Sequence, residues 1–288
     1  MGNFKILGKG MATASRNYGL LLWLWLIDVA FALVIVTPVF LLAKKDFGHS
    51  LVGGSLGRFR FEWLGDLAYR YQDLLPAIAG AVLVPALLFM GLFIFLNGGI
   101  IGRVAAGGKT NLQGFFADCG KYLWRFIRVF LLSLPVYAVV FGGLLRLLAA
   151  PLKAWMRNAS GEVPVIIASN LQLVITVLIL SIIQMFFDYM KVHIVVYDGR
   201  KVLGAAAATL SFIGKRFIRA WGLYLLVGLL FIAATAAFLV VTNILPGTGR
   251  LAFGFAFLWA QAYILARIWI KVLFFATEID FTRINWVE

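Results

Sequence analysis

Long apolar stretches alternate with short polar, mostly basic segments along the whole sequence. A helix that crosses the hydrocarbon core of a bilayer needs about 20 consecutive, mostly apolar residues. Six stretches reach that length, and each predicts a membrane-spanning helix. They cover residues 19–43, 76–101, 129–150, 163–187, 221–244 and 251–277. The pattern therefore predicts an all-α fold, an integral membrane bundle of six transmembrane helices.

Basic amphipathic stretches precede the first, third and fifth spans and predict helices at the membrane interface. At the start of the sequence, Phe4, Leu7 and Met11 form the expected apolar face. Short echoes between the stretches indicate a repeat of basic helix, span out and span in, over residues 1–105, 106–195 and 196–288 of one membrane domain, 1–288. The alternative is that the three stretches look alike only because any six-span protein with a cytoplasmic N-terminus has basic inner loops. The basic residues of the later stretches are Lys121, Arg125, Arg128, Lys215, Arg216 and Arg219.

Composition supports lipid as the main solvent of this chain. Hydrophobic residues make up 63% and charged residues 13% of the sequence, and mean hydropathy is +0.97. A soluble domain carries about 25% charged residues. With the N-terminus inside, 17 of the 26 Lys and Arg residues fall in cytoplasmic segments. The positive-inside rule therefore predicts that the N-terminus and the C-terminus are both cytoplasmic. Residues 62–75, in the largest outer loop, predict an amphipathic helix that lies flat on the outer surface or caps the bundle.

Several segments carry a family resemblance. They resemble a family of bacterial polytopic membrane proteins that has no established activity, and they are Leu7-Gly-Lys-Gly10 with Arg16-Asn17 after it, Gly48-His-Ser50, Gly120-Lys-Tyr-Leu-Trp-Arg-Phe126 and the stretch from Asp188 to Asp198. This resemblance implies a multi-pass protein of the bacterial inner membrane and supplies no catalytic residues. The layout is also loosely similar to the membrane domain of some glycerophosphodiester phosphodiesterases, although the sequence contains no phosphodiesterase domain.

Sequence motifs for catalysis and cofactor binding are incomplete. Gly108-Lys-Thr110 lacks the earlier glycine and the strand of a P-loop. Cys119 is the single cysteine, and His49 and His193 are predicted on opposite sides of the membrane. We therefore expect no catalytic, cofactor or metal site. Because the net charge of +14 belongs to so apolar a chain, we expect anionic lipid headgroups, not nucleic acid, as the partner.

Ionisable residues inside the spans are the most informative polar positions. An ionised side chain at mid-bilayer costs roughly 2.5–3.5 kcal/mol on insertion scales, so partners are expected. Asp28 and Arg267 lie at matching predicted depths, about 14–15 Å from the inner boundary, and predict an intramembrane ion pair. Asn97, Asp188 and Lys271 add polar groups near the inner ends of spans. The alternatives are a structural network, with side chains snorkelling to the interface, and an ion or substrate path.

Two functions are compatible with these features. The first is a non-catalytic scaffold or accessory subunit that binds a partner subunit or anionic lipid at its basic cytoplasmic face. The alternative is a transport protein, either a small-molecule carrier or a membrane subunit like those of ABC permeases. Gly120 and Leu134-Pro135 fit the coupling-loop pattern of such permeases, but the leading Glu-Ala-Ala is absent. A transporter would have a polar cavity at mid-depth, whereas a scaffold would be filled by apolar side chains.

Overall fold

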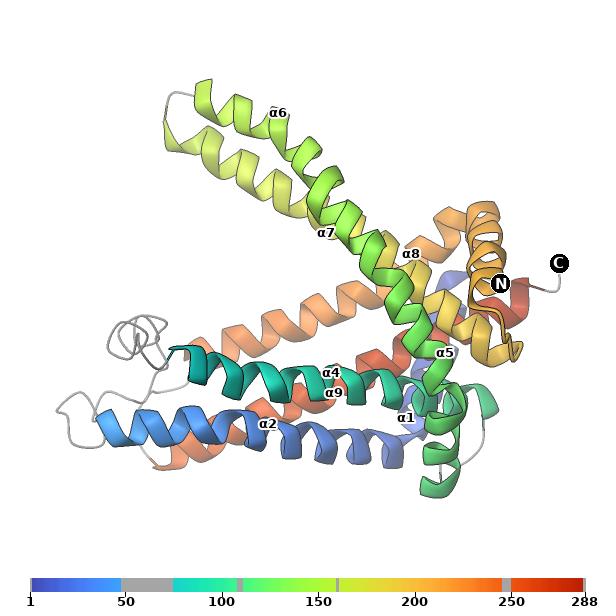
Figure 1. Cartoon of the computed structure of the whole chain (residues 1–288), viewed down its shortest axis with the longest axis horizontal. Coiled ribbons are helices and arrows are strands. Elements are labelled where there is room, and N and C mark those ends of the chain that lie inside the picture. The colour runs from blue at the N-terminus through green and yellow to red at the C-terminus, as the bar shows by residue number, and fades with distance from the viewer. Residues whose placement is uncertain (1, 48–74, 108–110, 159–160, 245–249, 287–288) are drawn as a thin grey trace. The chain divides into compact units, whose positions relative to one another are not determined.

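The computed structural model describes residues 2–47, 75–107, 111–158, 161–244 and 250–286, and in these residues all regular structure is helical (Figure 1). One short π-helical turn, η3 (Val140–Leu144), interrupts the third span. The α-helices are α1 (Asn3–Arg16), α2 (Tyr18–Phe47), α4 (Leu75–Ala106), α5 (Leu112–Val139), α6 (Leu145–Asn158), α7 (Glu162–Val196), α8 (Val202–Ile244) and α9 (Arg250–Asn285).

Six helical segments are long and apolar enough to cross a membrane, which confirms the all-α, multi-pass prediction. In the most apolar 18-residue stretch of each segment, the protein itself buries only 6% to 33% of the residues. Apolar helices with so little protein around them are expected when lipid, not water, is the solvent. The segments are Tyr18–Thr37, Leu83–Ala106, Leu112–Arg157, Glu162–Val196, Val202–Ile244 and Leu251–Asn285.

The chain forms two compact units, and long helices contribute to both. The first unit contains Met1–Ala14, Ile94–Gly228 and Val272–Glu288, and the second contains Ser15–Phe93 and Leu229–Lys271. The predicted repeat has different boundaries, and it stays a prediction.

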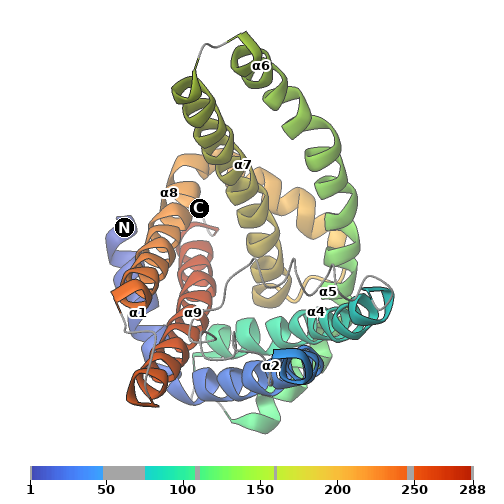
Figure 2. The same ribbon diagram turned by 90° about the vertical axis from the view of Figure 1, so that its left-hand side faces the viewer.

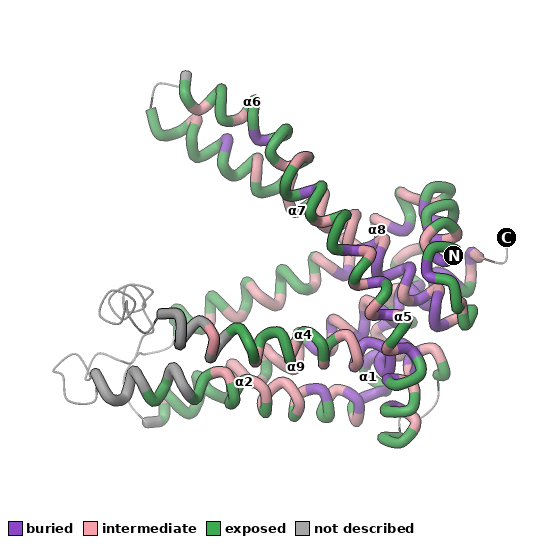
Figure 3. Tube along the Cα trace, viewed as in Figure 1, coloured by how far each residue is buried: buried purple, intermediate pink, exposed green. Residues whose placement is uncertain are grey.

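The core of the first unit lies where α1, α7, α8 and α9 meet. Tyr189 is at its centre, with its ring 6.2 Å from that of Phe212 and 5.9 Å from that of Phe281 between centroids. In this unit, buried residues concentrate in α1, the end of α4, one face of α5, the second half of α7, the first half of α8 and the end of α9 (Figure 3). In contrast, α6 and the start of α7 form a largely exposed hairpin (Figures 2 and 3). The remaining buried members of this core are Ile6, Met185, Ile213, Ala220 and Leu223.

In the second unit, α2, the first part of α4, the end of α8 and the first part of α9 are joined by aromatic side chains. The rings of Phe31 and Phe89 lie 5.5 Å apart and connect α2 to α4. The Phe238 and Tyr263 rings stack at 4.4 Å and connect α8 to α9. The Trp259 Nε1 donates a hydrogen bond to the Phe238 carbonyl oxygen at 3.3 Å, so the same pair of helices is tied by a polar contact as well.

The basic stretches before the third and fifth spans are continuous with those spans. Asn111 caps α5 by accepting a hydrogen bond from the Gly114 N–H at 2.9 Å, so the stretch begins as a regular helix and runs on into the span. In α8, Arg216 has φ −132° and ψ 28°, which kinks the helix between its basic first part and its apolar second part. Only α1 is a separate helix before its span. The predicted helix at residues 62–75 lies outside the described residues.

Candidate functional site

Asp28 lies on α2 beside the α9 helix of the second unit. One turn before it, the Trp25 Nε1 donates a hydrogen bond to the Gln261 Oε1 at 2.9 Å. Asp28 itself is half-buried. The first and sixth predicted spans are therefore neighbours, which the predicted Asp28–Arg267 pair requires.

Two basic side chains of α9 act on the Asp28 carboxylate. The positive charges of Lys271 and Arg267 both reach it, and the effect of Lys271 is the larger. The Lys271 Nζ also lies 3.2 Å from the centroid of the Phe93 ring, whereas the exposed Arg267 guanidinium lies 5.8 Å from that of Tyr263. Lys271 thus joins Arg267 as an electrostatic partner of Asp28, and the direct Asp28–Arg267 ion pair stays a prediction.

Asp188 is buried in the first unit and accepts hydrogen bonds from two side chains of its own helix, α7. The Lys191 Nζ donates to its Oδ1 at 2.7 Å, and the Gln184 Nε2 lies 3.2 Å from each of its oxygens. The Tyr224 hydroxyl of α8 interacts electrostatically with this carboxylate. Gln184 in turn accepts a hydrogen bond at 2.9 Å from the Tyr137 hydroxyl of α5. Sequence analysis selected Asp188 only as the end of a span, and the structure makes it the centre of a polar network.

Glu278 of α9 is a second buried carboxylate in this unit, and sequence analysis missed it. Its side chain interacts electrostatically with Asp188 and Lys191, and with the Tyr189 hydroxyl. The predicted span ended at Thr277, one residue earlier, whereas α9 continues to Asn285. The continuing apolar periodicity after Thr277 was the feature that could have revealed it.

Asn97, the third predicted inner-end polar residue, is buried in the first unit. It is 6% exposed, and its Oδ1 has no hydrogen-bond partner among the described residues. It stands at the start of a fully buried turn of α4 that packs against α5. Asn97 therefore belongs to the packed core of this unit.

Asp198, between α7 and α8, ties this connection to the basic face of α5. Its Oδ1 lies 2.6 Å from the Arg125 Nη1 and 3.6 Å from the Lys121 Nζ. The hydrogen bond from Arg125, with the positive charges of Arg125 and Lys121, lowers the pKa of the Asp198 carboxyl below its usual range. Its φ of 48° is in the left-handed region, where it ends α7 and lets the Gly199 N–H donate to the Ile194 carbonyl oxygen at 3.1 Å. Two of the six predicted basic residues are thus partly neutralised.

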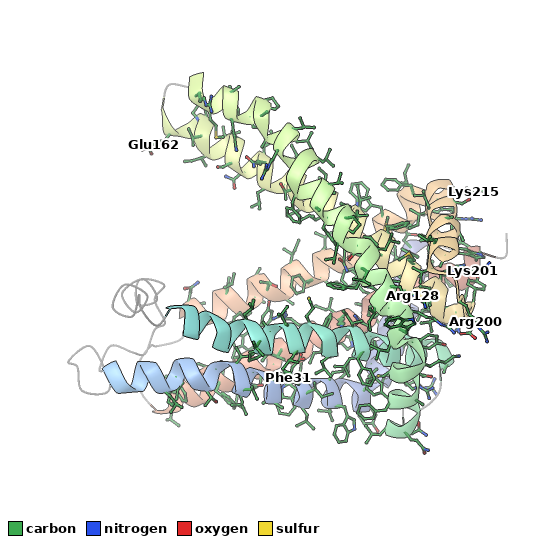
Figure 4. The ribbon with its side chains drawn as sticks, viewed as in Figure 1. Phe31, Arg128, Glu162, Arg200, Lys201 and Lys215 are labelled. Atoms are coloured by element: carbon green, nitrogen blue, oxygen red, sulfur yellow. The ribbon has the colours of Figure 1, made fainter. Side chains whose placement is uncertain are left out.

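The other predicted basic residues have different surroundings. Lys215 and Arg219 are exposed on the first part of α8 and just after its kink. Arg216 is half-buried, with its guanidinium 5.7 Å from the centroid of the Phe212 ring. Arg128 is exposed on α5 near the Trp124 ring, at 5.4 Å. Figure 4 shows Lys215 at the same end of the first unit as Arg200 and Lys201, and Glu162 at the far end of α7.

Large apolar side chains accompany these basic residues on the surface of α8. Leu203, Leu210 and Ile218 are 73%, 64% and 84% exposed. Lys201, just before this helix, and Lys215 and Arg219 within it are exposed as well, so this segment presents both apolar and basic side chains at its surface. Such a combination is typical of helices that lie in the headgroup region of an anionic membrane.

Within the described ranges, no three His, Cys, Asp or Glu residues form a group that could hold a metal ion. Comparison of the chain with protein-family models, curated proteins and solved structures finds no match. Function is therefore inferred from the geometry of the two units.

Proposed function

We propose that this chain is a multi-pass protein of the bacterial inner membrane that binds anionic lipid headgroups at a basic cytoplasmic face, as a scaffold or accessory subunit. The observation that carries the proposal is the exposure of both apolar and basic side chains along the start of α8: Leu203, Leu210 and Ile218 together with Lys201, Lys215 and Arg219. The apolar side chains would enter the headgroup boundary while the cations meet lipid phosphates.

The distribution of charge supports the cytoplasmic orientation. With the start of the sequence inside, 17 of the 26 Lys and Arg residues are cytoplasmic, including all those on the first part of α8. The cytoplasmic leaflet carries a negative surface potential, and each nearby Lys or Arg contributes about 1 kcal/mol of attraction to it. Arg200 extends the same end of the first unit (Figure 4).

A matched pair of triple variants tests lipid binding. Lys201→Gln/Lys215→Gln/Arg219→Gln removes about 3 kcal/mol of attraction, so the affinity for phosphatidylglycerol should fall about a hundredfold. Titration of the detergent-solubilised protein, followed by native mass spectrometry, measures this affinity. The control removes three exposed cations from the α6 helix, and should leave the affinity within about threefold. Equal losses in both variants would refute a specific basic face. The control substitutions are Arg146→Gln, Lys153→Gln and Arg157→Gln.

Transport is the second candidate function, because Asp188 and Glu278 form a buried polar centre among apolar helices. Ionisable groups inside membrane segments often line ion or substrate paths. The permease-like segment, residues 116–135, lies within the single continuous helix α5. Flux of a labelled solute in proteoliposomes that is abolished by Asp188→Asn would favour transport over the scaffold.

A further inference from the structure

Two carboxyl groups and one ammonium group form a buried cluster in the first unit. Asp188 and Glu278 are 7% and 2% exposed, and the Lys191 side chain is 18% exposed. Lys191 and Asp188 come from α7 and Glu278 from α9, and their charges interact. The polar groups around them are Gln184, Tyr137, Tyr189 and Tyr224.

Hydrogen-bond donors are shared unequally between the two carboxyl groups. Asp188 accepts hydrogen bonds from Lys191 and Gln184. Neither oxygen of Glu278 has a hydrogen-bond partner among the described residues, and the Tyr189 hydroxyl, which interacts with Glu278, also has none. An ionised carboxylate buried without donors is strongly unfavourable.

The net charge of the cluster also favours a protonated Glu278. With both carboxyl groups ionised and Lys191 protonated, the cluster carries one unbalanced negative charge. Lys191 already binds the Asp188 Oδ1 at 2.7 Å, so Glu278 has no cation of its own among these residues. A single proton balances the cluster.

We propose that Asp188 and Glu278 form a binding site for one proton, held mainly on Glu278. The proton is shared as a property of the pair, because the two carboxyl groups interact with each other and with the same lysine. Tyr137, Tyr189 and Tyr224 also face this cluster. This site does not depend on lipid binding at α8, and either proposal can fail without the other.

Infrared spectroscopy of the reconstituted full chain at pH 7 tests the proposal by counting protonated carboxyl groups through their C=O stretch. Exposed carboxyl groups, with pKa values near 4, are ionised at that pH. Glu278→Gln should remove one protonated group from the spectrum. Asp188→Asn should also remove one, because Lys191 then becomes the counter-ion of an ionised Glu278. Lys191→Met should add one, because both carboxyl groups then need a proton.

Two control variants isolate the cluster from other carboxyl groups. Glu162→Gln changes an exposed residue and should leave the signal unchanged. In an Asp28→Asn background, the difference made by Glu278→Gln should keep its full size. If Glu278→Gln misfolds, the opposite changes expected for Asp188→Asn and Lys191→Met each still test the charge count. A signal of the same size in the wild type and in every folded variant of the cluster would overturn the proposal.

Discussion

Adding one methyl group at Gly99 should separate α4 from α5. A Cβ at this position would lie 2.5 Å from the Cys119 Sγ and 2.6 Å from the Phe115 Cε2, closer than side chains tolerate. Both neighbours are buried, at 0% and 2% exposure, so they have little room to move. Overpacking of this kind costs about 1–3 kcal/mol. Gly120, on α5, is the matched control, because a Cβ added there would have no neighbouring atom within 4 Å.

The single cysteine supplies the assay. Cys119 is the only cysteine in the sequence and is buried, so a maleimide should label the native protein only when the α4–α5 contact opens. A cost of about 1–3 kcal/mol makes labelling of Gly99→Ala about 5- to 150-fold faster than that of Gly120→Ala. Comparing two Gly→Ala variants cancels the helix propensity that both gain, about 1 kcal/mol.

A second-site change separates this clash from a general loss of stability. Phe115→Leu removes the ring atom nearest to the added methyl group. The double variant Gly99→Ala/Phe115→Leu should therefore label more slowly than the sum of the two single effects predicts. Labelling of Gly99→Ala no faster than that of Gly120→Ala would refute the packing of α4 against α5.

The charged residues outside this contact give three more expectations. In double-mutant cycles on the free energy of unfolding in mixed micelles, Asp28 should couple more strongly to Lys271 than to Arg267, and the reverse order would contradict the electrostatics described for α9. Asp198→Asn should tighten phosphatidylglycerol binding about fivefold, because it unmasks about one net positive charge worth about 1 kcal/mol; weaker binding would exclude Asp198 as the neutralising group. Arg125 lowers the pKa of Asp198 in the folded protein. The stabilisation that the Arg125–Asp198 ion pair gives to the fold is therefore complete above the usual pKa near 4, and it is lost as the pH falls through the lower pKa of the folded state. Hydrogen–deuterium exchange of residues 197–201, corrected for the intrinsic rate, should thus lose protection only below about pH 4.

The spans could be predicted from the sequence because lipid imposes a minimum length of apolar helix. The buried faces could not be predicted as well. In α1, Phe4 of the predicted apolar face is 76% exposed, and the residues that the protein buries are Ile6, Gly10 and Ala14. A Cβ at Gly10 would lie 2.5 Å from the Thr277 Cγ2, so the absence of a side chain at Gly10 lets this face of α1 approach α9 closely. Hydrophobicity alone ranks Phe above Gly, and the small residues that allow close packing are therefore overlooked.

The pairing of polar groups could not be predicted from the sequence either, because it depends on tertiary structure. Depth along a span suggested Arg267 as the partner of Asp28, but the charge of Lys271, one helical turn away, acts on Asp28 as well. Glu278 was overlooked because hydropathy placed it just outside a span. Its burial depends on α7 and α8 of the first unit, which the local sequence does not encode.

The orientation of the chain in the membrane is the central claim, and cysteine accessibility in intact cells tests it most directly. In a Cys119→Ala background, Glu162→Cys and Ser211→Cys each place one thiol at an exposed position, at the start of α7 and on the first part of α8. A membrane-impermeant maleimide should label Glu162→Cys in intact cells, and should label Ser211→Cys only after the membrane is permeabilised. Labelling of Ser211→Cys from outside, with Glu162→Cys protected, would contradict the cytoplasmic basic face.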